Sequence, residues 1–519
     1  MGLQYDPKAN GNRNLYYHYL DEHKPDKLIA RIPKAEAYEV SFKISHDHRY
    51  LIIFDSQALY AANIESLDEE IQFKMIFKLT ENISYEYVGN EGDFFLFLKN
   101  IGAPKHHLVE IDITDKKPGR NFDVVVAENL NGHGVLKTAY AFSTFILLIY
   151  IERFQSSMYL YSSQSERIEY KIDLKNEQVV SSSIDKYGVF FETRSFKTPR
   201  KVYRIEFNQL LYREPYVTTY STIEPVLWKE SKIPNLDELK ITVQYDTYRS
   251  FDGTEVPMTI IQKKQSDCYR KPCLVYAYGG FGDCLLPRFD LYFLLFVELF
   301  NGVVVFIHIR GGGELGDVWS LKSSQIEISF NDLIAGVEYL KGESYTDTID
   351  SNKIAYHGTS HGGLVGAVVM NLRPNLFTAV TLLNGYFDLI IDLLDGDRLN
   401  QYGNINKKRN FDVIKKYAPL LHIQYPTRSE SYPTTLIVAS KKDDVVPMSN
   451  SLKYLAHRRE NAKKTQAQRE KPTLFKVINS GGHNYRTAIR RDFIDAVFVK
   501  LKFLAEAMEL RCDKVYQTN

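Results

Sequence analysis

Residues 353–364 read Lys-Ile-Ala-Tyr-His-Gly-Thr-Ser-His-Gly-Gly-Leu, and this stretch decides how the second half of the chain is interpreted. Its apolar beginning predicts a buried strand, and the segment after it has the apolar spacing of a helix. Between them, Gly358-Thr-Ser360-His-Gly362 matches the pattern of a nucleophile elbow, in which a serine occupies a strained strand-to-helix turn. The flanking glycines let the backbone turn there without clashes. The alternative is a plain glycine-rich turn, since the bare pattern is common by chance.

Around this stretch, from about residue 240 onward, strand-like runs alternate with segments of helix length. Continuous apolar strands separated by helices predict a mostly parallel sheet with helices on both faces, the arrangement of an α/β hydrolase. The expected strands are Cys273–Tyr278, Val303–Ile309, Lys353–His357, Ala379–Leu383, Thr435–Ala439 and Leu474–Ile478. The expected covering helices are Phe330–Leu340, Leu364–Asn371 and Phe493–Met508. We expect the linker to the first half around Glu224–Leu236, where two prolines punctuate the chain.

A nucleophilic serine requires a base and an acid that orients the base. In α/β hydrolases these follow in the order Ser, Asp, His, on loops after later strands. The strand ending at 439 runs into Ser440-Lys-Lys-Asp-Asp-Val-Val-Pro447, and the strand ending at 478 runs into Asn479-Ser-Gly-Gly-His483. Each segment alone could be a solvated turn or a loop with a surface histidine. Their coincidence in this order, after carboxyl ends of strands, favours a triad of Ser360, His483 and one of the two aspartates.

Two further features belong to the same predicted site. His357 and His361 are weaker candidates for the base, and we expect the backbone N–H of His361 to be its useful group. The glycine turn Tyr278-Gly-Gly-Phe281-Gly282 after the first strong strand can offer hydrogen-bond donors to an oxyanion. The alternative for this turn is a tight connection without a role in chemistry.

The first 225 residues have a different sequence pattern, with short apolar runs between polar turns. Four similar runs begin at residues 50, 94, 145 and 189, so their starts are 44, 51 and 44 residues apart. A repeat of about 40–50 residues with several short strands is typical of propeller blades, although the same periodicity also allows a β-sandwich. The 13% of aromatic residues also favours much β-structure.

Composition excludes several classes of function. A net charge of +1 gives no global argument for binding nucleic acid or an anionic membrane. Polar residues interrupt the most apolar stretch, Phe289–Ile309, which indicates a buried helix and a strand instead of a membrane span. The four cysteines lack metal-ligand spacing, and the first residues lack an apolar leader core. We therefore expect a cytoplasmic protein without metal or other cofactor.

Motifs throughout the chain resemble the prolyl oligopeptidase family. In the second half they are Tyr278-Gly-Gly-Phe281, Arg310-Gly-Gly-Gly-Glu314, the Ser360 elbow, Arg373-Pro374, Tyr417-Ala-Pro419, Val445-Val-Pro447 and the His483 loop. In the first half they are Leu15-Tyr-Tyr-His-Tyr19 and Lys43-Ile-Ser-His-Asp47. The resemblance implies an α/β-hydrolase domain joined to a seven-bladed β-propeller, and cleavage of short peptides after proline. We assign residues 226–519 to the hydrolase domain and residues 1–225 to an incomplete propeller of about four to five blades.

The resemblance also implies roles for individual residues. Ser360 would be the nucleophile, His483 the base, and the Tyr278 hydroxyl and the His361 N–H the oxyanion donors. We choose Asp443 as the acid because it precedes Pro447 by four residues, and Asp444 is the alternative. An ungapped match to the family would place Lys442 at the position of the acid. The implied substrate-binding residues are Phe281, Tyr402, Arg398 and Val445.

The chain departs from the family pattern in four respects. The family stacks a tryptophan on the substrate proline, where this chain has Arg398, and no arginine lies beside Asp443 to hold a substrate carbonyl. The elbow has Thr359 and His361 where glycine and asparagine are usual. The first half is also too short for seven blades, so we expect an incomplete or alternatively started chain, and a genuine small propeller is the alternative. An in-frame start about 190 codons upstream would close the propeller.

These departures define the competing hypotheses. The first is a serine peptidase acting on short peptides, with uncertain proline specificity. The second is an esterase or relaxed peptidase of the same fold, because a lost aromatic face weakens proline selectivity. The third is a non-catalytic scaffold. Arg398 could instead indicate acidic substrates. We expect a monomer in each case.

Overall fold

The computed structural model describes most of the chain, and the following account is confined to the residues that it describes. These are residues 2–5, 13–18, 23, 25–32, 41–54, 58–65, 71–78, 85–115, 122–128, 134–142, 144–185, 187–206, 220–233, 240–264, 270–286, 288–394, 401–423, 431–464 and 471–512. The chain divides into two compact units. The first unit comprises residues 1–176, 182–190 and 204–226, and the second unit comprises 177–181, 191–203 and 227–519.

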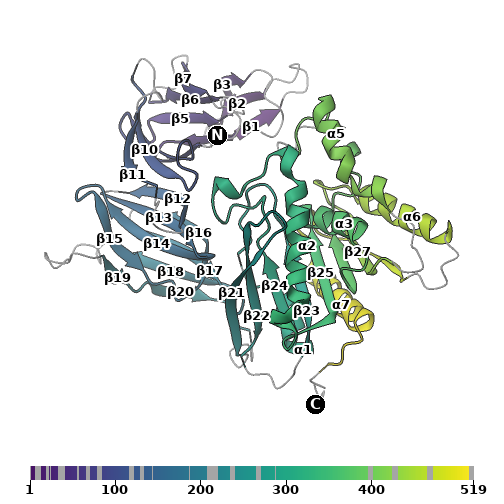
Figure 1. The fold of residues 1–519 in the computed structure, drawn as a ribbon. Coiled ribbons are helices and arrows are strands. Elements are labelled where there is room, and N and C mark those ends of the chain that lie inside the picture. The colour runs from purple at the N-terminus through teal and green to yellow at the C-terminus, as the bar shows by residue number, and fades with distance from the viewer. Residues whose placement is uncertain are drawn as a thin grey trace. The chain divides into compact units, whose positions relative to one another are not determined.

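The first half of the chain forms a succession of small, mostly antiparallel sheets, shown in purple to blue in Figure 1. The first two contain β1 (Gly2–Tyr5), β2 (Arg13–Tyr17) and β3 (Lys27–Ile32), and β4 (Ser41–Ile44), β5 (Tyr50–Phe54), β6 (Ala58–Asn63) and β7 (Lys74–Lys78). The third contains β8 (Tyr85–Glu91), β9 (Phe94–Lys99), β10 (His107–Asp112) and β11 (Asp123–Val126). The fourth contains β12 (Val135–Phe142), β13 (Phe145–Glu152), β14 (Gln155–Ser162), β15 (Arg167–Ile172) and β19 (Ser221–Ile223). The fifth contains β16 (Gln178–Ile184), β17 (Gly188–Arg194), β18 (Lys201–Glu206) and β20 (Val226–Glu230).

The predicted repeat corresponds to this modular construction. The four similar apolar runs form β5, β9, β13 and β17, and each is the second strand of its sheet in chain order. Apolar side chains from neighbouring sheets pack together, as where Phe77 of β7 meets Phe97 of β9 with 5.4 Å between ring centroids. Shared apolar clusters of this kind join each of the first three sheets to the next one along the chain.

The second unit is built on one eight-stranded sheet in the order β21-β22-β24-β23-β25-β26-β27-β28. Its strands are β21 (Ile241–Arg249), β22 (Glu255–Lys263), β23 (Lys271–Ala277), β24 (Val303–Ile307), β25 (Ile349–Thr359), β26 (Ala379–Leu383), β27 (Thr434–Ser440) and β28 (Thr473–Ile478). The pairs from β24 to β28 are parallel, and β22 pairs antiparallel with both β21 and β24. The six predicted strands all lie in this sheet.

Helices cover both faces of this sheet, as Figure 1 shows. The longer ones are α1 (Leu291–Phe300), α2 (Glu327–Lys341), α3 (His361–Leu372), α5 (Lys408–Tyr417), α6 (Met448–Lys464) and α7 (Arg490–Ala507); α4 (Leu389–Leu394) is short. One-turn 3₁₀ helices occur at Asp317–Trp319, Ser323–Gln325, Glu343–Tyr345, Pro419–His422 and Tyr485–Thr487. Side chains alternate along β24: Val305 packs into the core with α2 and α3, whereas Val304 packs with α1 and α7. Burial of both strand faces explains the continuous apolar runs in the sequence.

Two expectations need correction. Val226–Glu230 lies inside the predicted linker but forms β20, so only part of that segment connects elements. The hairpin of β21 and β22 was not among the expected strands, although its strands extend over Ile241–Arg249 and Glu255–Lys263. Its outer strand β21 is largely exposed, and an edge strand with mixed polarity lacks the continuous apolar run that identified the inner strands.

Among the described residues, no helix combines the length and the apolar character needed to cross a membrane.

Candidate active site

Ser360 lies at the sharp turn between β25 and α3. Its φ of 56° and ψ of −119° are unusual for a residue with a side chain, and such strain is typical of functional sites. The glycines on either side are required by space: a Cβ at Gly358 would lie 2.2 Å from the Gly362 carbonyl oxygen, and one at Gly362 would lie 2.6 Å from the Ala277 oxygen. The elbow predicted from the sequence therefore has the close backbone approaches that make glycine necessary.

Ser360, His483 and Asp443 form one continuous hydrogen-bonded chain. The Ser360 hydroxyl lies 2.9 Å from Nε2 of His483. On the other side of the ring, Nδ1 lies 2.9 Å and 3.1 Å from the two carboxylate oxygens of Asp443. The three side chains come from loops at the carboxyl ends of β25, β27 and β28, which lie in the same half of one parallel sheet. This arrangement can move a proton from the hydroxyl to the imidazole while the carboxylate orients the ring.

The two adjacent aspartates have different surroundings. The Asp443 side chain is fully buried, and its Oδ1 accepts hydrogen bonds from the backbone N–H groups of Val445 and Val446 at 2.9 and 2.8 Å. Asp444 is exposed. These backbone donors hold the Asp443 carboxylate in the orientation in which it meets His483.

Asn384, which sequence reasoning did not select, supports the histidine loop. It directly follows β26, and its Nδ2 donates to the His483 carbonyl at 2.9 Å and to the Ser440 hydroxyl at 3.1 Å. Its Oδ1 accepts from the Ser440 N–H at 2.8 Å. Asn384 thus connects the end of β27 to the loop after β28. Its position one residue past a predicted buried strand was the signal that could have identified it.

The histidine loop is also tethered on its C-terminal side. Arg486 forms an ion pair with Asp290, whose other oxygen caps α1 through the Tyr292 N–H at 2.9 Å. Lys500 of α7 is buried beneath this loop and donates to the Tyr485 hydroxyl at 3.2 Å. Burial lowers the pKa of Lys500 to about 8. These contacts explain how a loop with two consecutive glycines can hold His483 in place.

The expected oxyanion donors lie beside the nucleophile. Tyr278 follows β23, the parallel neighbour of β25, and Ser360 is among the groups that influence the pKa of its hydroxyl. Burial raises the pKa of Tyr278, so its hydroxyl keeps its proton and can donate. His361 is the first residue of α3, and backbone N–H groups in a first helical turn have no partner within the helix. Both groups can therefore donate to negative charge that develops near Ser360.

Aromatic side chains gather next to these donors. The Phe281 ring is 41% exposed and lies 5.8 Å from the His361 ring and 6.1 Å from the Tyr402 ring, between centroids. Tyr402 is fully buried. Val445 is half-buried and packs against the core that includes Tyr402, while Arg398 lies outside the described residues. The structure thus brings the Phe281 and Tyr402 rings together, with Phe281 partly exposed and Tyr402 buried behind it.

The Arg310 motif has a structural explanation. The Arg310 guanidinium contacts both carboxylate oxygens of Asp332 at 2.9 and 2.7 Å and also binds Asp252. Asp332 additionally accepts from the Ser250 hydroxyl at 2.6 Å. This network joins the β21–β22 turn to α2 and to the loop after β24.

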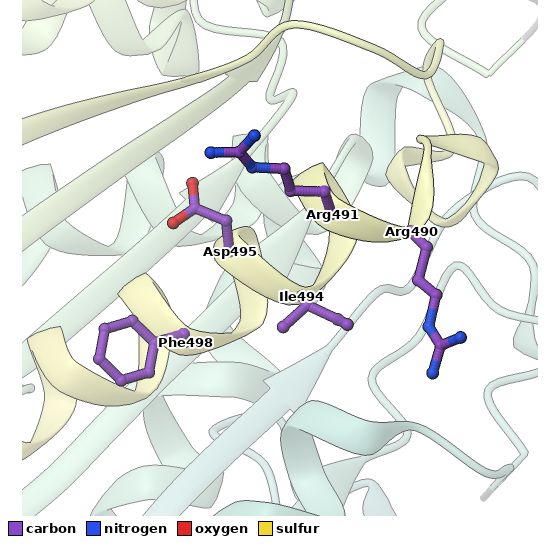
Figure 2. Close-up of a pocket in the computed structure, with 5 residues that line it drawn as sticks. All are labelled: Arg490, Arg491, Ile494, Asp495 and Phe498. Atoms are coloured by element: carbon purple, nitrogen blue, oxygen red, sulfur yellow. The ribbon is translucent and has the colours of Figure 1, made fainter.

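Figure 2 shows a surface pocket on α7. Its lining consists of Arg490, Arg491, Ile494, Asp495 and Phe498. The described residues contain no group of three or more His, Cys, Asp or Glu side chains that could hold a metal ion.

Comparison with known proteins agrees with this architecture. Residues 287–510 match the prolyl oligopeptidase family, and residues 2–212 match the N-terminal β-propeller domain of prolyl oligopeptidase. The chain belongs to the prolyl oligopeptidase family. The predicted fold class, an α/β hydrolase with a β-propeller, is thereby confirmed.

Relatives of this prolyl oligopeptidase family member are longer than the chain. It is 27% identical to the prolyl endopeptidase of Dictyostelium discoideum, covering 92% of this chain and 63% of that protein. It is 24% identical to prolyl oligopeptidase A of Amanita bisporigera, covering 97% and 65%. A solved structure of prolyl oligopeptidase B from Galerina marginata superposes with a TM-score of 0.84 at 21% identity, covering 98% of this chain and 71% of that one. The chain therefore spans just under two thirds of the curated relatives, and the structural likeness shows the fold.

Proposed function

We propose that this chain is a serine peptidase that hydrolyses short peptides on the carboxyl side of proline. The observation that carries the proposal is the unbroken chain of hydrogen bonds from the Ser360 hydroxyl through His483 to Asp443. Membership of the prolyl oligopeptidase family supports peptide substrates. Proline selectivity is supported by the partly exposed ring of Phe281, because a flat apolar surface suits the pyrrolidine ring.

The geometry supports the following reaction. Ser360 Oγ attacks the scissile carbonyl carbon while its proton passes to Nε2 of His483, and Asp443 stabilises the resulting imidazolium. The oxyanion of the tetrahedral intermediate accepts hydrogen bonds from the Tyr278 hydroxyl and the His361 N–H. His483 then gives the proton to the leaving amine as the carbon–nitrogen bond breaks, which leaves an acyl-enzyme. Water, activated by the same histidine, attacks this ester and releases Ser360.

A fluorophosphonate probe and two peptide reporters test the proposal. The wild type should react with the probe and should cleave a Gly-Pro reporter, because both reactions need the activated hydroxyl. Ser360→Ala should lose both activities, with hydrolysis reduced by about 10⁶-fold, and should unfold at an unchanged temperature. Folded wild-type protein that takes up no probe would exclude the enzymatic function and favour the scaffold hypothesis.

A relaxed peptidase or esterase is the second candidate. The two tryptophans favour it, because neither lies in the segment where the family has its proline-stacking tryptophan. Trp319 is 5% exposed and donates its Nε1–H to the His308 carbonyl, so it belongs to the core. Trp228 is 60% exposed on β20, far along the chain from the elbow. Equal rates on Gly-Pro and Ala-Ala reporters would select this candidate over the prolyl peptidase.

Other sequence-based expectations stay predictions. They are a monomeric state, a cytoplasmic location, the absence of nucleic-acid partners and the domain boundary at residues 225 and 226. The role of Arg398 in binding acidic substrates is also a prediction. It would be contradicted if Arg398→Trp left the preference for acidic over proline-containing peptides unchanged.

A further inference from the structure

The proposed mechanism uses the backbone of His361 and leaves its side chain without a role. The imidazole is fully buried although it directly follows the nucleophile in the sequence. It is surrounded by aromatic rings, with centroid distances of 5.6 Å to Tyr278, 5.8 Å to Phe281 and 5.7 Å to Tyr402. A buried imidazole among these rings needs a hydrogen-bond partner to offset the loss of water.

Tyr402 is that partner. Its hydroxyl lies 2.5 Å from Nδ1 of His361. Burial lowers the pKa of His361 to about 4, so the ring is neutral near pH 7, and burial raises the pKa of Tyr402, so the hydroxyl keeps its proton. A neutral tyrosine hydroxyl can donate or accept, so the direction of this bond depends on which ring nitrogen of His361 carries the proton. With the proton on Nε2, the hydroxyl donates and Nδ1 accepts.

This hydrogen bond determines which part of Tyr402 remains available for contacts with other side chains. Because the hydroxyl is engaged by His361, Tyr402 has its aromatic ring left for contacts with Phe281. The neighbouring Gln401 is tied to the same place, since its Oε1 accepts the Phe281 N–H at 2.6 Å. Two hydrogen bonds from consecutive residues thus fix the 401–402 turn against the elbow and against the Phe281 turn.

We propose that the His361 side chain is a positioning residue for substrate recognition, which acts by accepting a hydrogen bond from the Tyr402 hydroxyl and holding the buried Tyr402 ring behind Phe281, whose exposed ring would contact the residue before the scissile bond. This inference rests on the proposed function and deepens it. The essential atom is the acceptor at the δ position of residue 361. A side chain with an acceptor at that position can serve, whereas an apolar side chain of similar size cannot.

Four variants test the role of this acceptor. Tyr402→Phe removes the donor and His361→Leu removes the acceptor, while the double variant removes both. His361→Asn is the matched control, because its Oδ1 occupies the place of Nδ1. KM and kcat are measured with Gly-Pro and Ala-Ala reporters, and thermal unfolding identifies variants that fail to fold.

The expected pattern separates positioning from packing. Tyr402→Phe and His361→Leu should each raise KM for the Gly-Pro reporter about 10-fold and alter kcat much less, since a buried polar atom loses its partner. The double variant should be no worse than either single variant, because the two changes remove one interaction. His361→Asn should recover most of the affinity lost in His361→Leu. Additive losses, unchanged KM values, or equal defects in the Asn and Leu variants would overturn the inference.

A binding measurement keeps the test independent of catalysis. In the Ser360→Ala background, calorimetry measures the Kd of N-acetyl-Gly-Pro-Gly-amide with and without Tyr402→Phe. If the wild type hydrolyses neither reporter but Tyr402→Phe weakens this binding about 10-fold, the proposed function fails and the positioning role stands. Equal binding by both proteins, or no binding by either, overturns the positioning role.

Discussion

The two units bury their apolar residues in different ways. In the first unit, separate clusters join neighbouring sheets: one contains Phe77 and Phe97, and the next contains Leu98 and Leu148. In the second unit, two large cores lie on opposite faces of a single sheet. A modular stack distributes its stability over local interfaces, whereas one sheet with covered faces concentrates it. The difference matters for function because only the parallel sheet directs several loop ends to one edge, where the triad assembles.

Catalysis by the second unit should depend on individual side-chain atoms. The two adjacent aspartates allow the sharpest test of this expectation. Asp443→Asn should lower kcat by about 10⁴-fold, because an amide supports the wrong tautomer of His483. Asp444→Asn is the matched control, and its exposed side chain should affect kcat less than 10-fold. Both rates are measured with the Gly-Pro reporter. The reverse order of effects would transfer the role of the acid to Asp444.

Core truncations compare the two kinds of packing directly. Phe97 is fully buried between sheets of the first unit, and Phe330 of α2 is 1% exposed in the second. Replacement of either by Ala should cost about 3–5 kcal/mol through lost transfer energy and a cavity. Phe330→Ala should lower the temperature at which fluorophosphonate labelling is lost, whereas Phe97→Ala should shift a calorimetric transition and leave labelling unaffected. Equal effects on labelling would show that the two units unfold together.

Buried histidines of the second unit should also make the free energy of unfolding depend on pH. Burial lowers the pKa of His361 to about 4, from its ordinary value of 6.5. Between these values the unfolded chain binds the proton and the folded chain does not, so stability should fall as the pH drops from 6.5 to 4. The slope reaches about 1.4 kcal/mol per pH unit, or about 3 kcal/mol over the window.

Denaturant unfolding at several pH values measures this slope. His361→Asn should reduce it, because Asn does not titrate. His357→Asn should act in the same direction, since burial lowers the pKa of His357 as well. An unchanged slope in His361→Asn would contradict the prediction and would show that other groups govern acid destabilisation.

Local patterns were sufficient for most of the fold. The strands from β23 to β28 appear as continuous apolar runs because both of their faces are buried, and α2, α3 and α7 follow from their apolar spacing. The hairpin of β21 and β22 was missed because β21 is an exposed edge strand with mixed polarity. β20 was missed because its residues lie between prolines in a segment that looked like a linker.

Residues of the candidate site could be predicted where they directly follow a strand that was itself predicted. Ser360 and His483 could be selected because each follows a recognisable strand, and their order along the chain matched their chemistry. Asn384 also follows a recognisable strand, which was its one signal in the sequence, but its role is seen only from the His483 carbonyl that lies 2.9 Å from its Nδ2. Arg398 lies outside the described residues, so its place at the site stays a prediction.

The sequence by itself determined the elements, the elbow and the order of the triad, because periodicity, glycine and chain order are local properties. Only the tertiary structure decided which side chains meet. It buried the Asp443 carboxylate beside His483 and left Asp444 exposed, although the two are neighbours in the sequence. It also joined His361 to Tyr402 across 41 residues. Such pairings depend on sheet order and on the direction of each side chain, which are set by the packing of the whole unit and not by any short segment of sequence.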